Sequence, residues 1–457
     1  MDSAPFAKGA PNIYTSSILA RENPFHFTNC SHPQKPRRRP TPYTVKRMRK
    51  IPILILLLAS AAWAAGTLQV LQSFGTGNLY KGSDLYAGII MDSQGNLYGA
   101  AESGGPRGFG VIYELSPTTT TGGGWTETVL YNFKGGTGDG AGPHATLFAD
   151  SAGNLYGTTA AGGTRSSTCR TGCGTVFMLM PAAGQWQETV LYRFTGGTDG
   201  ATPYAGVVMD TAGNLYGTTI SGGASDAGAV YKLTPGAIGE WTETVVYSFG
   251  GHPDGASPYP TPILDAAGNL YGTTNTGGTH NLGIVYMLAV QPDSSFAEHV
   301  VHTFAGGADG ANPLAGLTFD QNGNLYGTTS YGGTANCGIA FALEPDAEGG
   351  WTEHLLHTFL GAPYDGENPN GLTFDAQGNI YGTTSGGGVD NPGTIFKMTH
   401  TSTGWQEIVL YNFTAGDDGA YPFSGVALDH AGNIYGTTLW GGRAGSTIGG
   451  VAFRFTQ

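Results

Sequence analysis

The chain is 457 residues long, contains 77 glycines and carries a formal net charge of −13. Its first 64 residues hold ten of the 20 Lys and Arg residues but two of the 33 acids, so the remainder carries ten basic and 31 acidic side chains, a net charge of −21. This excess repels phosphate backbones, which excludes nucleic acid as an expected partner and suits an exported protein that meets cations or neutral sugars.

A secretory signal is predicted near the N-terminus. Met48-Arg49-Lys50 forms a basic region, an apolar run follows, and Ala62-Trp63-Ala64 is a small-residue cleavage site. The run is shorter than the ~20 apolar residues of a spanning helix. We therefore expect a signal peptide at 48–64, no membrane span after its removal, and a location outside the cell or in the cell envelope. Residues 1–47 are interpreted as disordered chain or as an untranslated upstream segment.

Residues 66–457 are organised around a recurring motif, D-x-x-G-N-L-Y-G-T-T, which is most regular at Asp320–Thr329. It occurs seven times, with steps of 54 to 60 residues. Self-similarity at a nearly fixed period indicates a tandem repeat whose units complete their cores against their neighbours. The D-x-x-G-N turns lie at 92–96, 150–154, 210–214, 265–269, 320–324, 375–379 and 429–433.

Each repeat contains four strand-like runs. Examples are Gly316–Asp320 before the D-x-x-G-N turn, Asn324–Thr329 after it, Gly174–Leu179 and Trp125–Phe133. Four short strands rich in aromatic and β-branched residues, separated by turns, are typical of a propeller blade. The sequence therefore predicts an all-β, seven-bladed β-propeller with four antiparallel strands in each blade.

The two ends of the repeat region predict how the ring closes. The last repeat stops after its third strand, Gly450–Phe455, while Thr67–Phe74 resembles the missing fourth strand. We expect this N-terminal strand to complete the last blade.

Four motifs recur in fixed order: G-N-L-Y-G-T-T, G-T-V-F-x-L, W-T-E-T-V-L-Y-x-F and G-G-x-D-G-A-x-P. Together they resemble exported bacterial "choice-of-anchor tandem repeat" proteins that carry the GloVer repeat, over roughly residues 67–457. The resemblance implies export and association with the cell surface, and it implies no particular activity.

Candidate ligand-binding positions lie where the chain enters the innermost strand of each blade, on the face expected to hold the channel mouth. These seven mouth positions differ from blade to blade, as a recognition surface on a rigid frame requires, although exposed loop residues can also drift freely. Tyr331 and Trp440, in neighbouring Gly-Gly loops, are assigned to the same face. The mouth positions are Tyr86, His144, Tyr204, Tyr259, Leu314, Asn370 and Phe423.

A recurring aspartate in the D-G-A-x-P loop is also placed on this face, and blade 1 has Lys81 there instead. These acids suit Ca²⁺, which prefers oxygen ligands, but the favoured interpretation is that each caps its own loop. Calcium is the one cofactor that the pattern suggests. The residues are Asp139, Asp199, Asp254, Asp309, Asp365 and Asp418.

The remaining candidates are cysteines and histidines. Cys169 and Cys173 are close enough in sequence for a local disulfide, or they remain as inert thiols. The pairs His299/His302 and His354/His357 have a spacing seen in metal sites, but residues i and i+3 of a strand point to opposite faces. They are therefore assigned to surface or packing roles.

Two functions follow. The first is an exported or cell-surface binding propeller, monomeric, with a glycan or protein ligand at the channel mouth. The alternative is an exported lyase or glycosidase that acts on a polysaccharide or glycoside, with catalytic groups drawn from His144, His280 and the acids of the mouth face. No catalytic residue set can be singled out among seven near-equivalent repeats.

Overall fold

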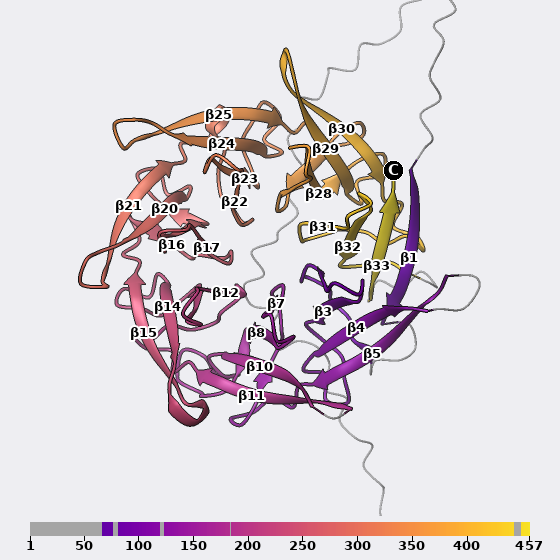
Figure 1. Ribbon diagram of the computed structural model, residues 1–457. Helices are drawn as coiled ribbons and strands as arrows, with labels where there is room; N and C mark the ends of the chain where they lie inside the picture. The colour runs from indigo at the N-terminus through magenta and orange to yellow at the C-terminus, as the bar shows by residue number, and fades with distance from the viewer. Residues whose placement is uncertain (1–65, 76–80, 119–122, 183, 443–448) are drawn as a thin grey trace, which may run out of the picture.

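The computed structural model describes residues 66–75, 81–118, 123–182, 184–442 and 449–457. Within these residues the chain forms seven antiparallel sheets, six with four strands and one with five, arranged as blades around a central channel (Figure 1). The predicted seven-bladed propeller is confirmed. The predicted upstream segment and signal peptide lie outside the described residues.

Blades 1 to 7 follow the order of the repeats, and the strands of each blade are named from the channel outward. Blades 1 to 3 contain β2 (Ile90–Met91), β3 (Leu97–Ala101), β4 (Val111–Pro117) and β5 (Trp125–Asn132); β7 (Phe148–Ala149), β8 (Leu155–Thr159), β10 (Thr175–Ala182) and β11 (Gln185–Arg193); β12 (Val207–Met209), β13 (Leu215–Thr219), β14 (Ala229–Pro235) and β15 (Trp241–Ser248).

Blades 4 to 7 repeat this arrangement, and the outermost strand of blade 7 comes from the N-terminus. They contain β17 (Ile263–Leu264), β18 (Leu270–Thr274), β20 (Ile284–Val290) and β21 (Phe296–Thr303); β22 (Thr318–Phe319), β23 (Leu325–Thr329), β24 (Ile339–Pro345) and β25 (Trp351–Thr358); β27 (Thr373–Phe374), β28 (Ile380–Gly387), β29 (Thr394–Thr401) and β30 (Gly404–Asn412); β31 (Ala427–Leu428), β32 (Ile434–Thr438), β33 (Gly450–Thr456) and β1 (Thr67–Phe74).

Strands β1 and β33 close the ring. They pair antiparallel, with Leu68 opposite Phe455 and Phe74 opposite Gly450, and lie side by side next to the C-terminus (Figure 1). The predicted completion of the last blade by the N-terminal strand is confirmed. Closure of this kind leaves no blade with an unpaired third strand.

Short additional elements lie in the loops. They are β6 (Gly140–Ala141) paired with β9 (Ala161–Gly162), β16 (Gly255–Ala256) paired with β19 (Thr276–Gly277), β26 (Gly366–Pro369) paired with β28, and two 3₁₀ turns, η2 (Ala237–Gly239) and η3 (Gly307–Asp309). Among the described residues, no helix has the length and apolar character needed to cross a membrane.

The D-x-x-G-N turn owes its recurrence to the hydrogen bonds of its aspartate. Asp210 Oδ1 accepts from the backbone N–H groups of Ala212 and Asn214, both at 2.9 Å, and Oδ2 accepts from Asn214 Nδ2 at 2.7 Å and Tyr216 Oη at 3.2 Å. Gly213 has φ of 84°, which favours glycine. Burial alone would raise the pKa of Asp210, but the hydrogen bonds hold it below its usual value. The motif is thus a structural turn on the face opposite the mouth.

Pairs of aromatic rings form the core between blades. Phe194, which follows the outermost strand of blade 2, packs edge-on against Tyr231 on the third strand of blade 3, with centroids 5.0 Å apart. A Cβ added at Gly217 would lie 2.3 Å from Tyr231 Oη, so the glycine of the L-Y-G-T-T motif makes room for this ring. The same pairing joins all seven blades: Phe74–Tyr113, Phe133–Phe177, Phe249–Tyr286, Phe304–Phe341, Phe359–Phe396 and Phe413–Phe453 complete the set.

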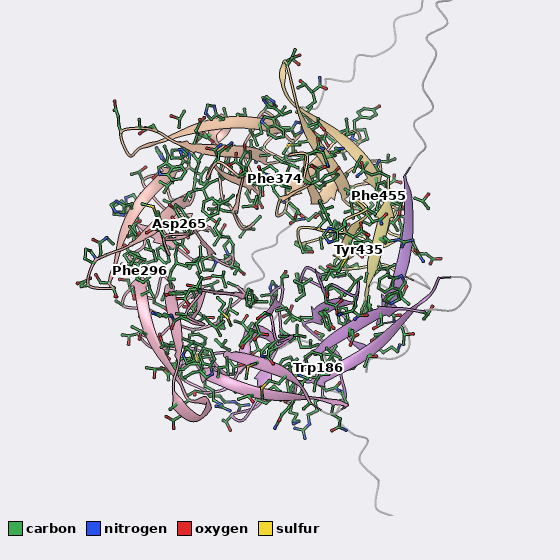
Figure 2. The ribbon with its side chains drawn as sticks, in the orientation of Figure 1. Trp186, Asp265, Phe296, Phe374, Tyr435 and Phe455 are labelled. Carbon is green, nitrogen blue, oxygen red and sulfur yellow. A yellow bond between two sulfur atoms is a disulfide. The ribbon has the colours of Figure 1, made fainter. Side chains whose placement is uncertain are left out.

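A second set of ring contacts also joins neighbouring blades. Trp186 of blade 2 lies 6.2 Å from Tyr98 of blade 1, and Phe296 of blade 4 lies 6.2 Å from Tyr216 of blade 3. Figure 2 shows Trp186 and Phe296 towards the periphery of different blades. The core is therefore distributed over the boundaries between blades, as a closed repeat protein requires.

Candidate functional site

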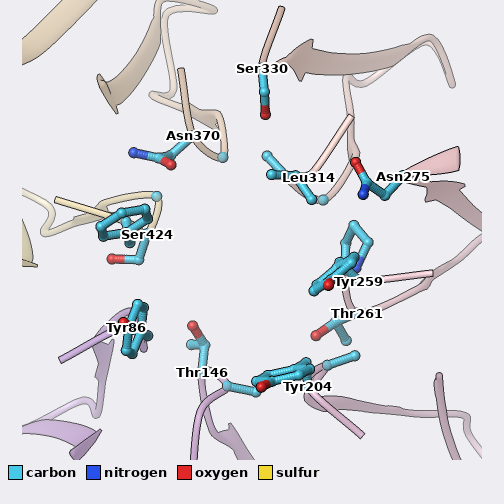
Figure 3. A pocket seen from close by; sticks show the side chains of 18 of the residues that line it. Tyr86, Thr146, Tyr204, Tyr259, Thr261, Asn275, Leu314, Ser330, Asn370 and Ser424 are labelled. Atoms are coloured by element: carbon cyan, nitrogen blue, oxygen red, sulfur yellow. The ribbon is translucent and has the colours of Figure 1, made fainter. Parts of the chain in front are cut away.

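The channel contains a cavity of about 630 Å³ (Figure 3). All seven mouth positions line it, together with Tyr331. The structure therefore brings residues from every blade together at one opening, although their positions along the chain span more than 300 residues.

Aromatic side chains form an arc along one side of the cavity. Phe423 of blade 7 lies 5.5 Å from Tyr86, whose ring stacks on His144 at 4.6 Å and 19°. His144 meets Tyr204 edge-on at 4.5 Å, and Tyr204 stacks on Tyr259 at 5.8 Å and 25°. Five ring-bearing side chains from blades 7, 1, 2, 3 and 4 are thus in continuous contact.

A common backbone frame presents these side chains. Thr202, two residues before Tyr204, has φ of 56°, and a proline follows it. The Thr202 N–H donates to the backbone oxygen of Cys173 in the preceding blade at 2.9 Å, and Asn312 donates in the same way to Leu282 at 2.8 Å. The frame is fixed by hydrogen bonds to the neighbouring blade, so the mouth residue can vary without changing the backbone.

The other side of the cavity carries amides and hydroxyls. Figure 3 shows Asn275, Ser330 and Asn370 around the side away from Tyr86 and Tyr204. Asn370 Nδ2 donates to the backbone oxygen of Pro422 at 2.8 Å and to Thr383 Oγ1 at 3.0 Å, so its orientation is fixed. This side of the cavity therefore offers neutral hydrogen-bonding groups, and the orientation of the Asn370 amide is fixed.

The cavity surface is uncharged at neutral pH. Among the described residues that line it, none carries a carboxylate, ammonium or guanidinium group. His144 is the one imidazole in this set, and burial lowers its pKa to about 3, so its ring is neutral. Burial also raises the pKa of Tyr204 well above its usual range, so the phenol keeps its proton.

Two acids of blade 1, Asp84 and Glu102, stand close to the arc without lining the cavity, and the sequence reasoning missed both. Burial raises the pKa of Glu102 to about 7, with a further contribution from the charge of Asp84. Alignment of the repeats would have revealed Glu102, because the other blades have uncharged residues there: Ala160, Ile220, Asn275, Ser330, Ser385 and Leu439.

The recurring loop aspartates do not line the cavity. Asp199 Oδ2 accepts from Tyr192 Oη on the outermost strand at 3.0 Å and from the Thr195 N–H at 2.7 Å, and Asp139 and Asp254 make equivalent contacts. Each aspartate thus caps its own loop at the outer part of the blade. The hydrogen bonds thus show the loop-capping role that the sequence offered beside calcium binding, with each loop folded back onto the outermost strand.

Four further candidate residues do not line the cavity: Trp440, His280, Cys169 and Cys173. Trp440 is 37% exposed and meets the ring of Tyr421 edge-on at 5.1 Å, and His280 is exposed. Cys169 and Cys173 are joined by a disulfide within an enlarged loop of blade 2.

Three of the four strand histidines contact carboxylates rather than only packing, and the contact of His354 is with Glu344, at 3.2 Å. His302 Nε2 lies 2.9 Å from Asp309 Oδ1, and His357 Nε2 lies 3.2 Å from Asp365 Oδ2. The simple alternation of side chains, by which i and i+3 point to opposite faces, is interrupted in these strands. Strand β21 has a bulge between the residues paired with Val285 and Tyr286, which lies between His299 and His302.

Residues 60–286 and 163–370 match the model of the Gloeobacter/Verrucomicrobia repeat, in tandem. Comparison with the curated proteins gave no match. Among solved structures, one provisionally described as a gluconolactonase is similar at 16% identity with a TM-score of 0.34, covering 62% of this chain and 80% of that one. Another, provisionally a 6-phosphogluconolactonase of Bacteroides uniformis, is similar at 16% identity with a TM-score of 0.49, covering 75% and 88%. With these identities and TM-scores, neither similarity supports an inference about activity.

Proposed function

Because the chain belongs to the Gloeobacter/Verrucomicrobia repeat family and has an uncharged cavity in its channel, we propose that it is an exported binding protein for a neutral glycan. The observation that carries this proposal is the arc of contacting rings opposite the amides and hydroxyl of Asn275, Ser330 and Asn370.

The chemistry of the cavity supports a sugar as ligand. Aromatic rings offer rigid apolar faces for the C–H face of a pyranose, while amides and hydroxyls pair with its hydroxyl groups. The cavity volume of 630 Å³ lies inside the range of about 300–1,000 Å³ usual for small-ligand sites. The lack of charge in the described lining favours a neutral glycan over an acidic one.

The enzyme alternative has less support. Glycosidases generally use two carboxyl groups about 5–9.5 Å apart on either side of the bond that breaks. Among the described lining residues there is no such pair, and His144, with its pKa lowered to about 3, is a poor base. Glu102 is the acid that this alternative would have to use.

A glycan array probed with the full chain tests the proposal, followed by calorimetric titration of the retained oligosaccharides. The same oligosaccharides are incubated with the protein and checked for cleavage products. Retention of neutral glycans without cleavage supports a binding protein, whereas cleavage favours the enzyme. If no glycan is retained at millimolar concentration, the proposal is wrong.

A further inference from the structure

A second set of polar residues lies at the boundaries between blades. At five of the seven boundaries, three positions of the repeat meet near the outer surface: a residue near the end of one blade's outermost strand, the loop aspartate that follows it, and a glutamate on the outermost strand of the next blade. We call this group the seam cluster. Three of these five boundaries have tyrosine at the first position: Tyr131/Asp139/Glu188, Tyr192/Asp199/Glu243 and Tyr247/Asp254/Glu298.

Two successive boundaries have histidine in place of tyrosine. The clusters are His302/Asp309/Glu353 between blades 4 and 5, and His357/Asp365/Glu407 between blades 5 and 6. In each, one ligand atom of every side chain lies within 4.8 Å of the other two. The imidazole is already directed at the aspartate, at 2.9 Å in the first cluster and 3.2 Å in the second.

The seam clusters need positive charge or a proton. In each histidine cluster two carboxylates lie close together and are at least partly buried, Asp309 with Glu353 and Asp365 with Glu407. One oxygen of each glutamate, Oε1, is buried and has no hydrogen-bond partner among the described residues. Blade 1 shows another solution to the same problem, because Lys81 replaces the aspartate and its Nζ lies 2.9 Å from Glu127.

The donor atoms of the two histidine clusters suit a transition metal. Each offers one imidazole nitrogen and two carboxylate groups, which is a set that Zn²⁺ accepts and that Ca²⁺, an oxygen binder, does not prefer. Ligands bound to zinc at about 2.0–2.1 Å in a tetrahedron are roughly 3.4 Å apart. A separation within 4.8 Å therefore lets each cluster close around an ion by small side-chain rotations.

We propose that these two clusters each bind one Zn²⁺ ion, through His302, Asp309 and Glu353 in one and His357, Asp365 and Glu407 in the other. The partial exposure of His302 (18%) and Asp309 (24%) leaves a path for the ion and room for water as a further ligand. Each ion links two neighbouring blades. Zinc binding thus stabilises the ring, because the site exists only when the blades are packed together.

The chain supplies its own matched control, since tyrosine stands at the same position in three other clusters. His302→Tyr and His357→Tyr therefore replace the metal ligand with the residue that this fold already accepts there. Conversely, Tyr247→His gives the cluster between blades 3 and 4 the same metal-binding groups as the two histidine clusters.

The test is a zinc titration of the full chain without a histidine tag, after removal of metal with a chelator and against a chromophoric competitor. We expect two Zn²⁺ ions per chain, one for each single histidine variant, none for the double variant and three for Tyr247→His. The metal-free variants should melt at the temperature of the metal-free parent, and only zinc-binding variants should gain thermal stability with zinc.

A control variant separates these sites from surface histidines. His354 is half-exposed and pairs with Glu344 at 3.2 Å outside the clusters, so His354→Ala should leave the stoichiometry at two. The proposal is overturned if the parent binds no zinc at about 100 μM free ion, if the double histidine variant still binds two ions, or if His354→Ala removes one.

Discussion

The ring of Phe74 packs against the ring of Tyr113, with centroids 4.7 Å apart, and this contact joins the last blade to the first. Phe74 belongs to the N-terminal strand β1, whereas Tyr113 lies on the third strand of blade 1. The contact is equivalent to the six other ring pairs between blades, so closure uses the same packing as the rest of the core.

Loss of this contact should open the ring. Phe74→Ala removes a fully buried ring, and we expect a loss of about 3–5 kcal/mol in the free energy of unfolding, measured by denaturant titration. Deletion of Thr67–Phe74 should unfold the protein or make it associate through the exposed edge of β33, visible by size-exclusion chromatography. Gln69→Ala on the same strand is the control and should cost little. A deletion variant that remains monomeric with unchanged melting would contradict the role of β1.

A buried hydroxyl predicts a stabilising substitution. Tyr231 Oη is buried without a hydrogen-bond partner among the described residues, and blades 2, 5, 6 and 7 have phenylalanine at that position. We expect Tyr231→Phe to raise the free energy of unfolding by about 1 kcal/mol, because an unpaired buried polar group is removed. Tyr192→Phe is the comparison: it loses a 3.0 Å hydrogen bond to Asp199 and should be destabilising. Equal effects of the two substitutions would refute this account.

Stability should fall as the pH rises from about 5 to 8. Burial raises the pKa of seven glutamates. The pKa is about 7 for Glu102, Glu188, Glu243, Glu298 and Glu407 and about 8 for Glu353, and that of Glu127 is raised as well. The folded state therefore holds more protons than the unfolded state between the ordinary glutamate pKa and these values, and the stability this provides is lost as the pH rises through them.

His144 acts in the opposite direction, since its lowered pKa makes the unfolded state the better proton binder below pH 6.5, but it is one group against seven glutamates. Thermal melting at closely spaced pH values, in chelator, measures the slope. Glu298→Gln fixes one group in a neutral form and should reduce the slope. A melting temperature that rises steadily from pH 5 to 8 would show that the carboxyl pairs are not protonated as described.

The ring arc should carry ligand binding. Tyr204 and Tyr259 stack on one another in the cavity, so replacing both with alanine should abolish glycan binding in calorimetric titration. Because both side chains are half-buried, some loss of stability is expected, and circular dichroism must show that the fold remains. Substitutions at Ala267 and Asn322, in D-x-x-G-N turns on the opposite face, should leave binding unchanged. If binding survives the loss of both tyrosines but is lost in the control variants, the binding site lies on the opposite face.

Export is a prediction from the N-terminal sequence alone. We expect translation to begin at Met48 and the mature protein to begin at Ala65 or within a residue or two of it. N-terminal sequencing of the protein recovered from the culture medium or cell envelope measures this directly. Residues 1–47 on the mature protein would contradict it.

The sequence alone determined the number of blades, the strands within each and the closure by the N-terminal strand. These features depend on contacts that are short in sequence or repeated in every unit. The aspartate of each D-x-x-G-N turn, for example, bonds to groups two, four and six residues further on, as Asp210 does to Ala212, Asn214 and Tyr216. Such local chemistry can be recognised wherever the motif occurs.

The sequence also placed the seven mouth positions on one face, because alternation of turns in antiparallel strands fixes which loops share a face. Only the tertiary structure decided which rings touch, and that Asn370 is held by Pro422 of the next blade. The tertiary structure also showed that the loop aspartates lie beside the outermost strands, outside the cavity lining, and that His302 lies close to Asp309 and Glu353. Glu353 comes from the blade that follows His302 and Asp309, and a bulge in β21 shifts the facing of the side chains of that strand. Their proximity depends on how one sheet packs on the next, which no spacing within a single repeat encodes.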